Sequence, residues 1–78
     1  MFRKISTTVT ANGTVSQSEM YTVDAMQVEA DKADDRRRLR HDAMGYGRIV
    51  EIADTMTGLV ITYTSGAVVI YQWVAVPE

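Results

Sequence analysis

The chain has 78 residues, of which 46% are hydrophobic and 23% charged, and a formal net charge of -2. These values predict one small globular domain spanning residues 1–78, and they exclude a disordered tail or a generally DNA-binding surface. The absence of cysteine excludes disulfides and thiolate metal sites. No apolar run approaches the roughly 18 residues that span a bilayer, and MFRKISTTVT does not resemble a signal peptide. We therefore expect an intracellular protein without membrane association.

The first 23 residues predict a β-hairpin. Residues 3–10 alternate with a period of two, which is typical of a strand with one face in water. One face would carry Arg3, Ile5, Thr7 and Val9, and the other Lys4, Ser6, Thr8 and Thr10. Asn12-Gly13 predicts a tight turn. A second strand over residues 14–23 would follow, with Val15, Tyr21 and Val23 on one face.

A helical pattern begins at Asp24, because Asp24 and Gln27 form a capping-box-like pair. Acidic residues crowd the early turns and arginines the later ones, an order that suits the helix dipole. A stripe of small apolar residues should let the helix lie close to a sheet: Met26, Ala30, Ala33 and Met44. Gly45 and Gly47 should end the helix.

The last third predicts three strands, over residues 48–53, 59–64 and 67–76, joined by turns at 54–58 and 65–66. Short turns favour antiparallel neighbours. The fold class is therefore α+β, a single helix packed on a curved antiparallel sheet in the order ββαβββ. The last strand, AVVIYQWVAV, is apolar on both faces. Either the sheet curls to bury both faces, or one face meets a partner.

The sequence contains no recognisable catalytic motif. There is one histidine, His41, and a helix would turn the neighbouring Asp42 about 100° away from it. No phosphate-binding glycine motif occurs. The aromatic strand residues Tyr21, Tyr63, Tyr71 and Trp73 fit a core or cross-strand pairs better than base stacking. We expect no enzyme, no metal and no cofactor.

Residues 31–42, DKADDRRRLRHD, hold five bases and four acids. On a helix, Asp34 can pair with Arg37 or Arg38, and Asp35 with Arg38. Lys32, Arg36 and Arg40 follow one another at i, i+4 and i+8 without helical partners. This row is either a solvated surface or a ridge for phosphate or an acidic protein. The candidate partner-binding residues are Lys32, Arg36, Arg37, Arg38, Arg40, Asp31, Asp34 and Asp35.

The assembled pattern resembles small phage-encoded anti-CRISPR proteins. In element order the chain is most similar to a type I-F inhibitor of similar size, and the likeness covers most of the chain. In residues it rests on the strand from Gly47 to Ile52, the Gly58-Leu59 strand start, Tyr63, and the Gly66 turn before Trp73.

The resemblance implies a stoichiometric inhibitor in the cytoplasm of a host bacterial cell. Such proteins bind the RNA-guided surveillance complex (Cascade) and stop it recognising target DNA. The type I-F member also recruits duplex DNA through helix bases, and residues 32–40 stand in that place here. This chain departs from the pattern in its longer helical region and its many aspartates. Asp31, Asp34, Asp35 and Asp42 could instead compete with phosphate in a basic groove.

Other functions remain open at this stage. A nucleic-acid-binding module would use the arginines, and a self-assembling phage structural component would use the apolar last strand or a free sheet edge. A homodimer through the last strand would fit the third possibility.

Overall fold

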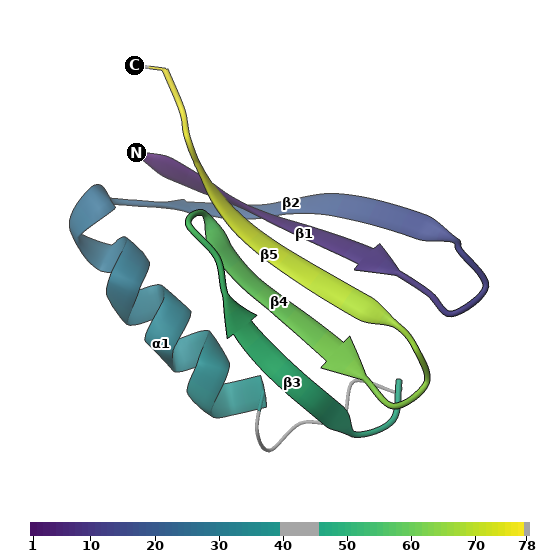
Figure 1. Ribbon diagram of the computed structural model, residues 1–78. Coiled ribbons are helices and arrows are strands. Elements are labelled where there is room, and N and C mark those ends of the chain that lie inside the picture. Colours follow the sequence, from purple (N-terminus) through teal and green to yellow (C-terminus); the bar gives the residue numbers. More distant parts are fainter. Residues whose placement is uncertain (40–45, 78) are drawn as a thin grey trace.

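The α+β class predicted from the sequence is confirmed by a computed structural model, which describes residues 1–39 and 46–77 (Figure 1). The strands and helices follow the predicted order ββαβββ. Their bounds are β1 (Phe2–Val9), β2 (Val15–Val23), a short 3-10 helix η1 (Ala25–Gln27), α1 (Val28–Leu39), β3 (Ile49–Asp54), β4 (Gly58–Tyr63) and β5 (Val68–Ala75).

All five strands form one antiparallel sheet in the order β2-β1-β5-β4-β3. The last strand therefore returns to pair with the first, and the two ends of the chain lie side by side (Figure 1). The strand β5 is central and paired on both sides, so a homodimer cannot form by strand addition to β5. The free edges of the sheet are β2 and β3.

Glycines form the predicted turns. Gly13 adopts a φ of 90° and donates its N–H to the carbonyl of Thr10 at 2.9 Å. Gly66 adopts a φ of 92° and donates to the carbonyl of Tyr63 at 3.0 Å. Residues with a side chain rarely adopt this left-handed conformation, so glycine sets the position and length of both turns.

A bulge in β2 corrects the predicted faces of the hairpin. Lys4 pairs with Tyr21 but the next residue, Ile5, pairs with Glu19, so Met20 has no partner on β1. The extra residue reverses the alternation of side chains along β2. Tyr21 therefore points to the helix side of the sheet, whereas Val15, opposite Val9, points to the other side. The sequence pattern had placed Val15 and Tyr21 on one face.

The core lies between α1 and the strands β4 and β5. Its buried residues are Leu39, Leu59, Ile61, Tyr63, Ala67, Val69, Tyr71 and Trp73. The predicted core role of Tyr63, Tyr71 and Trp73 is thus confirmed. On the opposite face of β5, Val68 and Ile70 are half-buried and Val74 is exposed. The curvature of the sheet therefore covers that face only in part.

The predicted apolar stripe of the helix is wrong. Met26 is 94% exposed, and Ala30 and Ala33 also face water. Asp35 and Leu39 are the buried residues of α1 instead. Met26 lies in η1, ahead of α1, and the side chain of Asp24 makes no capping hydrogen bond. Within α1, the side of the helix that faces the sheet carries Asp35, whose carboxylate pairs with the buried Lys4. Met44 of the predicted stripe and Gly45 of the predicted helix end lie outside the described residues, whereas Gly47 is described and adopts a φ of 93°.

Candidate functional site

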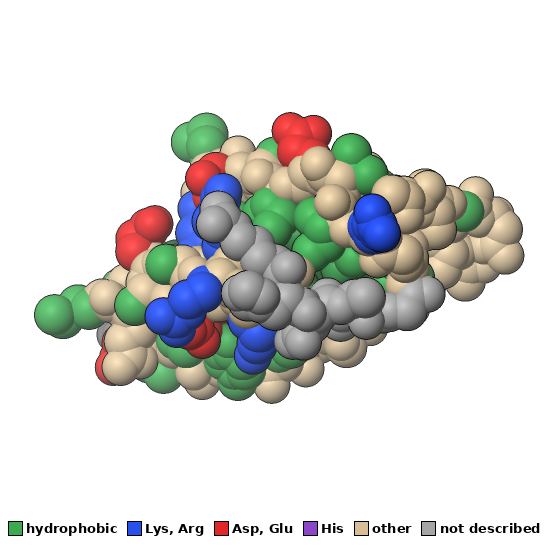
Figure 2. All heavy atoms as spheres, turned by 90° about the horizontal axis from the view of Figure 1, so that it is seen from below, with side chains coloured by type: hydrophobic (Ala, Val, Ile, Leu, Met, Phe, Trp, Pro, Cys, Tyr) green, Lys and Arg blue, Asp and Glu red, His purple; other side chains and the backbone are tan. Residues whose placement is uncertain are grey.

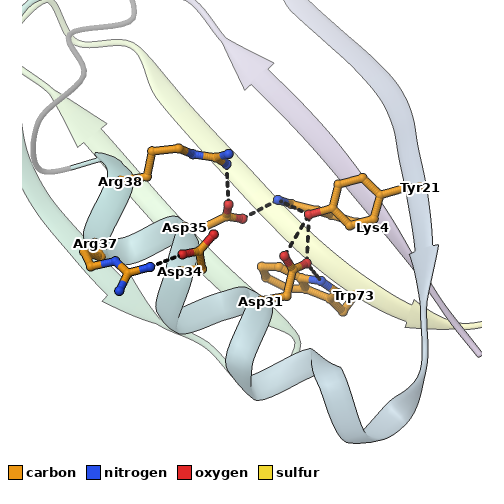
Figure 3. Close-up of polar contacts among 8 residues, drawn as sticks. All are labelled: Lys4, Tyr21, Asp31, Asp34, Asp35, Arg37, Arg38 and Trp73. Carbon is orange, nitrogen blue, oxygen red and sulfur yellow. Dashed lines mark hydrogen bonds and ion pairs between the residues drawn. The ribbon is translucent and has the colours of Figure 1, made fainter.

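Lys4 on β1 is fully buried and faces α1. Its ammonium donates hydrogen bonds to the carboxylate of Asp35 and, at 3.0 Å, to the hydroxyl of Tyr21 (Figure 3). The rings of Tyr21, Tyr71 and Trp73 surround the Nζ atom, with centroids 5.1, 4.6 and 5.2 Å away. Cation–π attraction and a paired carboxylate thus replace the water that this charge loses. Lys4 is the buried residue of β1, so the side of the strand that carries it is the one that faces α1.

Asp31 completes this network one helical turn before Asp35. Its carboxylate accepts from the hydroxyl of Tyr21 at 2.8 and 2.9 Å and from Nε1 of Trp73 at 2.9 Å. Figure 3 shows both aspartates pointing from α1 toward the sheet. We call Lys4, Tyr21, Asp31, Asp35 and Trp73 the inner network. In this network the polar groups of α1 form hydrogen bonds with those of the sheet. The network therefore fixes the orientation of the helix on the sheet.

The inner network shifts the pKa values of its members. Burial by itself would lower the pKa of Lys4, but the hydrogen bonds to Asp35 and Tyr21 and the charge of Asp35 outweigh it, so the pKa lies above its ordinary value. Burial raises the pKa of Tyr21, and the hydrogen bond to Asp31 adds to that shift. Lys4 is therefore charged and Tyr21 neutral at physiological pH.

On the outer side of α1, two ion pairs match the predicted i,i+3 spacing. Arg37 pairs with Asp34, and these side chains are 77% and 53% exposed. Arg38 is 56% exposed and reaches inward to Asp35 at 2.5 Å. We call Asp34, Arg37 and Arg38 the outer face. An exposed pair such as Asp34–Arg37 contributes at most about 1 kcal/mol to stability, so it stays available to a partner.

The row of unpaired bases predicted on the helix is not unpaired in the structure. Asp54, at the end of β3, lies 2.6 Å from Arg36 and 3.9 Å from Lys32. Lys32 also donates to the carbonyl of Thr55 at 3.4 Å. The third member of the row, Arg40, lies outside the described residues. Helical spacing could not predict these ion pairs, because Asp54 is distant in sequence from α1. The fold brings the end of β3 next to the helix.

The structure thus divides the predicted partner-binding residues into three groups. Asp31 and Asp35 belong to the inner network, Lys32 and Arg36 contact Asp54, and the outer face remains in water. Figure 2 shows acidic and basic side chains of the described residues close to one another on the visible surface. Lys4 and Tyr21 were missed. The spacing of Asp31 and Asp35, which places both on one helix face, is the signal that could have indicated a buried cation.

A shallow groove of about 300 Å³ lies beside the start of α1. Its apolar part includes Phe2, Val28 and Met56, and the charged side chains of Glu29 and Lys32 border it. The side chain of Met56 is fully exposed on the turn after β3. The groove adds apolar contact area next to the charged helix, as interfaces with other proteins commonly do.

Residues 1–39 and 46–77 contain no cluster of His, Asp or Glu side chains that could hold a metal ion. In the same part of the chain, no helix is long and apolar enough to cross a membrane. Comparison with protein-family models, with curated proteins and with solved structures found no match.

Proposed function

We propose that this protein is a non-catalytic inhibitor that binds a type I CRISPR-Cas surveillance complex and blocks recognition of target DNA. The observation that carries the proposal is the outer face of α1, where Asp34 and Arg37 are 53% and 77% exposed. The inner network holds this helix in one orientation on the sheet. The order ββαβββ, shared with small phage-encoded inhibitors, supports it by analogy.

A protein target fits this surface better than duplex DNA. Each of the four described bases of α1, Lys32, Arg36, Arg37 and Arg38, has a carboxylate within 4.0 Å. A phosphate backbone would have to displace those carboxylates and would meet their negative charge. A protein surface that carries both signs of charge can instead match the outer face, which sets register and selects the partner.

The acids give the proposal a mechanism. A DNA-binding groove is basic, and an exposed carboxylate can occupy the position of a phosphate in it. Asp34 and the exposed Glu29 on α1 are placed for this. Asp31 and Asp35 are not available, because the inner network holds them. Asp42 lies outside the described residues.

The test is whether the protein restores plaque formation by a targeted phage on cells carrying type I CRISPR systems. The informative variant exchanges the outer pair, Asp34→Arg with Arg37→Asp. This exchange keeps the i,i+3 ion pair and the net charge but inverts the pattern that a partner meets. The matched control exchanges the exposed pair Arg3–Glu19 on the hairpin, Arg3→Glu with Glu19→Arg.

Restored plaquing with the native protein and the control, lost with the helix exchange, is the expected result. Plaquing restored equally by all three would retain inhibition but would remove the outer face from it. If the native protein protects no phage against any type I subtype tested, the proposed function is wrong for those subtypes.

A further inference from the structure

The free edge of β2 carries few of the features that protect sheet edges from pairing. Residues 15–22 are all exposed, and β2 pairs with β1 alone within the described residues. The strand has nine residues, no proline and no lysine, and one charged side chain, Glu19. Lysines, prolines and short length are the usual protection of an edge. The bulge at Met20 protects only the end of β2 that follows it.

The turn fixes which backbone groups point outward from this edge. Thr10 donates its N–H to the carbonyl of Thr14 at 2.9 Å, and the alternation of an antiparallel ladder proceeds from that bond. Ser16 and Ser18 then direct their backbone N–H and C=O groups toward β1. Val15, Gln17 and Glu19 direct theirs away from the sheet, and no strand of the described chain receives them.

The outward N–H and C=O groups of one copy can bond to the same groups of a second copy when the two β2 strands run antiparallel about a two-fold axis at Gln17. Gln17 then pairs with Gln17 of a second copy, and Val15 pairs with Glu19, so each pair exchanges both backbone hydrogen bonds. The two Glu19 carboxylates would lie about 14 Å apart along the strand, which exceeds the screening length of physiological salt. No like charges face each other in this register.

The opposite edge of the sheet differs, so such pairing would stop at two copies. β3 has six residues, Val50 is bulged out of its pairing with β4, and Glu51 and Asp54 carry negative charge. These features discourage strand addition at β3. Pairing at β2 alone is isologous and therefore closed.

We propose that the protein forms a two-fold dimer through antiparallel pairing of β2 with β2 of a second copy. The dimer joins two five-stranded sheets into one continuous sheet, with both helices on the same face. This assembly does not depend on the inhibitor function, and it uses the edge strand β2 rather than the last strand.

The test uses charge at the two-fold axis. In Gln17→Lys and in Gln17→Glu, like charges face each other across a residue pair whose Cα atoms lie about 5.5 Å apart, and we expect each substitution to raise the dimer dissociation constant about ten-fold. An equimolar mixture of the two variants should form a heterodimer. The matched control is Gln72→Lys, which adds the same charge to the same face of the sheet but on the central strand β5.

Sedimentation equilibrium from micromolar to millimolar protein measures each case. The expected result is a dimer for the native chain and for Gln72→Lys, weakened dimers for the two Gln17 variants, and recovery on mixing. A native chain that is monomeric throughout would overturn the proposal. So would a dimer that is unaffected by Gln17→Lys, or a mixture that fails to recover, because each would place the contact elsewhere.

Discussion

Replacing Asp35 by leucine should be the most damaging single change in the inner network. Asp35 is 1% exposed and pairs with Lys4, which is completely buried. Without this carboxylate, the hydrogen-bond partner that remains to Lys4 among the described residues is the hydroxyl of Tyr21. Removing one member of a buried ion pair typically costs about 3–5 kcal/mol, because the remaining charge is left without compensation.

This loss is large for a domain of this size. At roughly 0.05–0.15 kcal/mol per residue, the 78 residues correspond to about 4–12 kcal/mol of total stability. Asp35→Leu should therefore remove a large part of this stability, and it would unfold the protein at room temperature if the total lies at the lower end of the range. Lys4→Met should cost less, because Asp35 then still has Arg38 as its ion-pair partner at 2.5 Å.

Urea unfolding measures these free energies, and the single tryptophan makes fluorescence a local reporter. Trp73 is 3% exposed, and its ring centroid lies 5.2 Å from the ammonium of Lys4. The double variant Lys4→Met with Asp35→Leu should be more stable than Asp35→Leu alone, because the buried charge of Lys4 is removed together with its partner and only the exposed Arg38 loses an ion pair. The reasoning is refuted if Asp35→Leu costs less than about 1 kcal/mol, or if the two single costs simply add.

Three further outcomes follow from the same contacts. The free energy of unfolding should hold at neutral pH and fall above about pH 10. Folding raises the pKa of Lys4 above 10.5 and the pKa values of three tyrosines, Tyr21, Tyr63 and Tyr71, above 10.0. The folded state therefore binds more protons than the unfolded state at alkaline pH, and this stabilisation is lost as the pH rises through the raised pKa values. Urea midpoints measured from neutral to strongly alkaline pH should show this fall, and a rise in stability over that range would contradict it. Tyr21→Phe should cost about 1–3 kcal/mol in urea unfolding, because its hydroxyl bridges Lys4 and Asp31; an unchanged midpoint would show that the bridge contributes nothing. Gly58→Ala should lower the thermal midpoint more than Gly13→Ala. A Cβ at Gly58 would overlap the backbone carbonyl of Tyr71, whereas a Cβ at Gly13 would meet no atom within 4 Å and would cost only the strain of a φ of 90°. Equal effects would mean that the strands adjust.

The fold was predictable because its signals are local. Alternation of side chains indicated the strands, and glycines at positions 13 and 66 indicated where the chain reverses. These signals depend on neighbours in sequence, so they do not require knowledge of the tertiary packing. The i,i+3 pairs of Arg37 and Arg38 were predictable for the same reason.

The orientation of the helix was not predictable, because it depends on contacts between distant residues. The bulge at Met20 turns Tyr21 toward Lys4, and only then does an aspartate on the inner side of α1 have a partner. The sequence prediction assumed that the apolar residues of the helix face the sheet, and this assumption fails for a helix that packs through its carboxylates. The contact of Asp54 with Arg36 has the same origin, since it joins β3 to α1.

The central claim is that this protein acts by binding a type I surveillance complex, and titration of the purified complex with the purified protein tests it most directly. Binding of a labelled target duplex by the complex is measured at each ratio. The proposed function predicts that target binding falls to zero at a fixed stoichiometry, and that the exchanged pair Asp34→Arg with Arg37→Asp weakens this effect. Target binding that stays unchanged for complexes of every type I subtype, at any excess of protein, would contradict the claim.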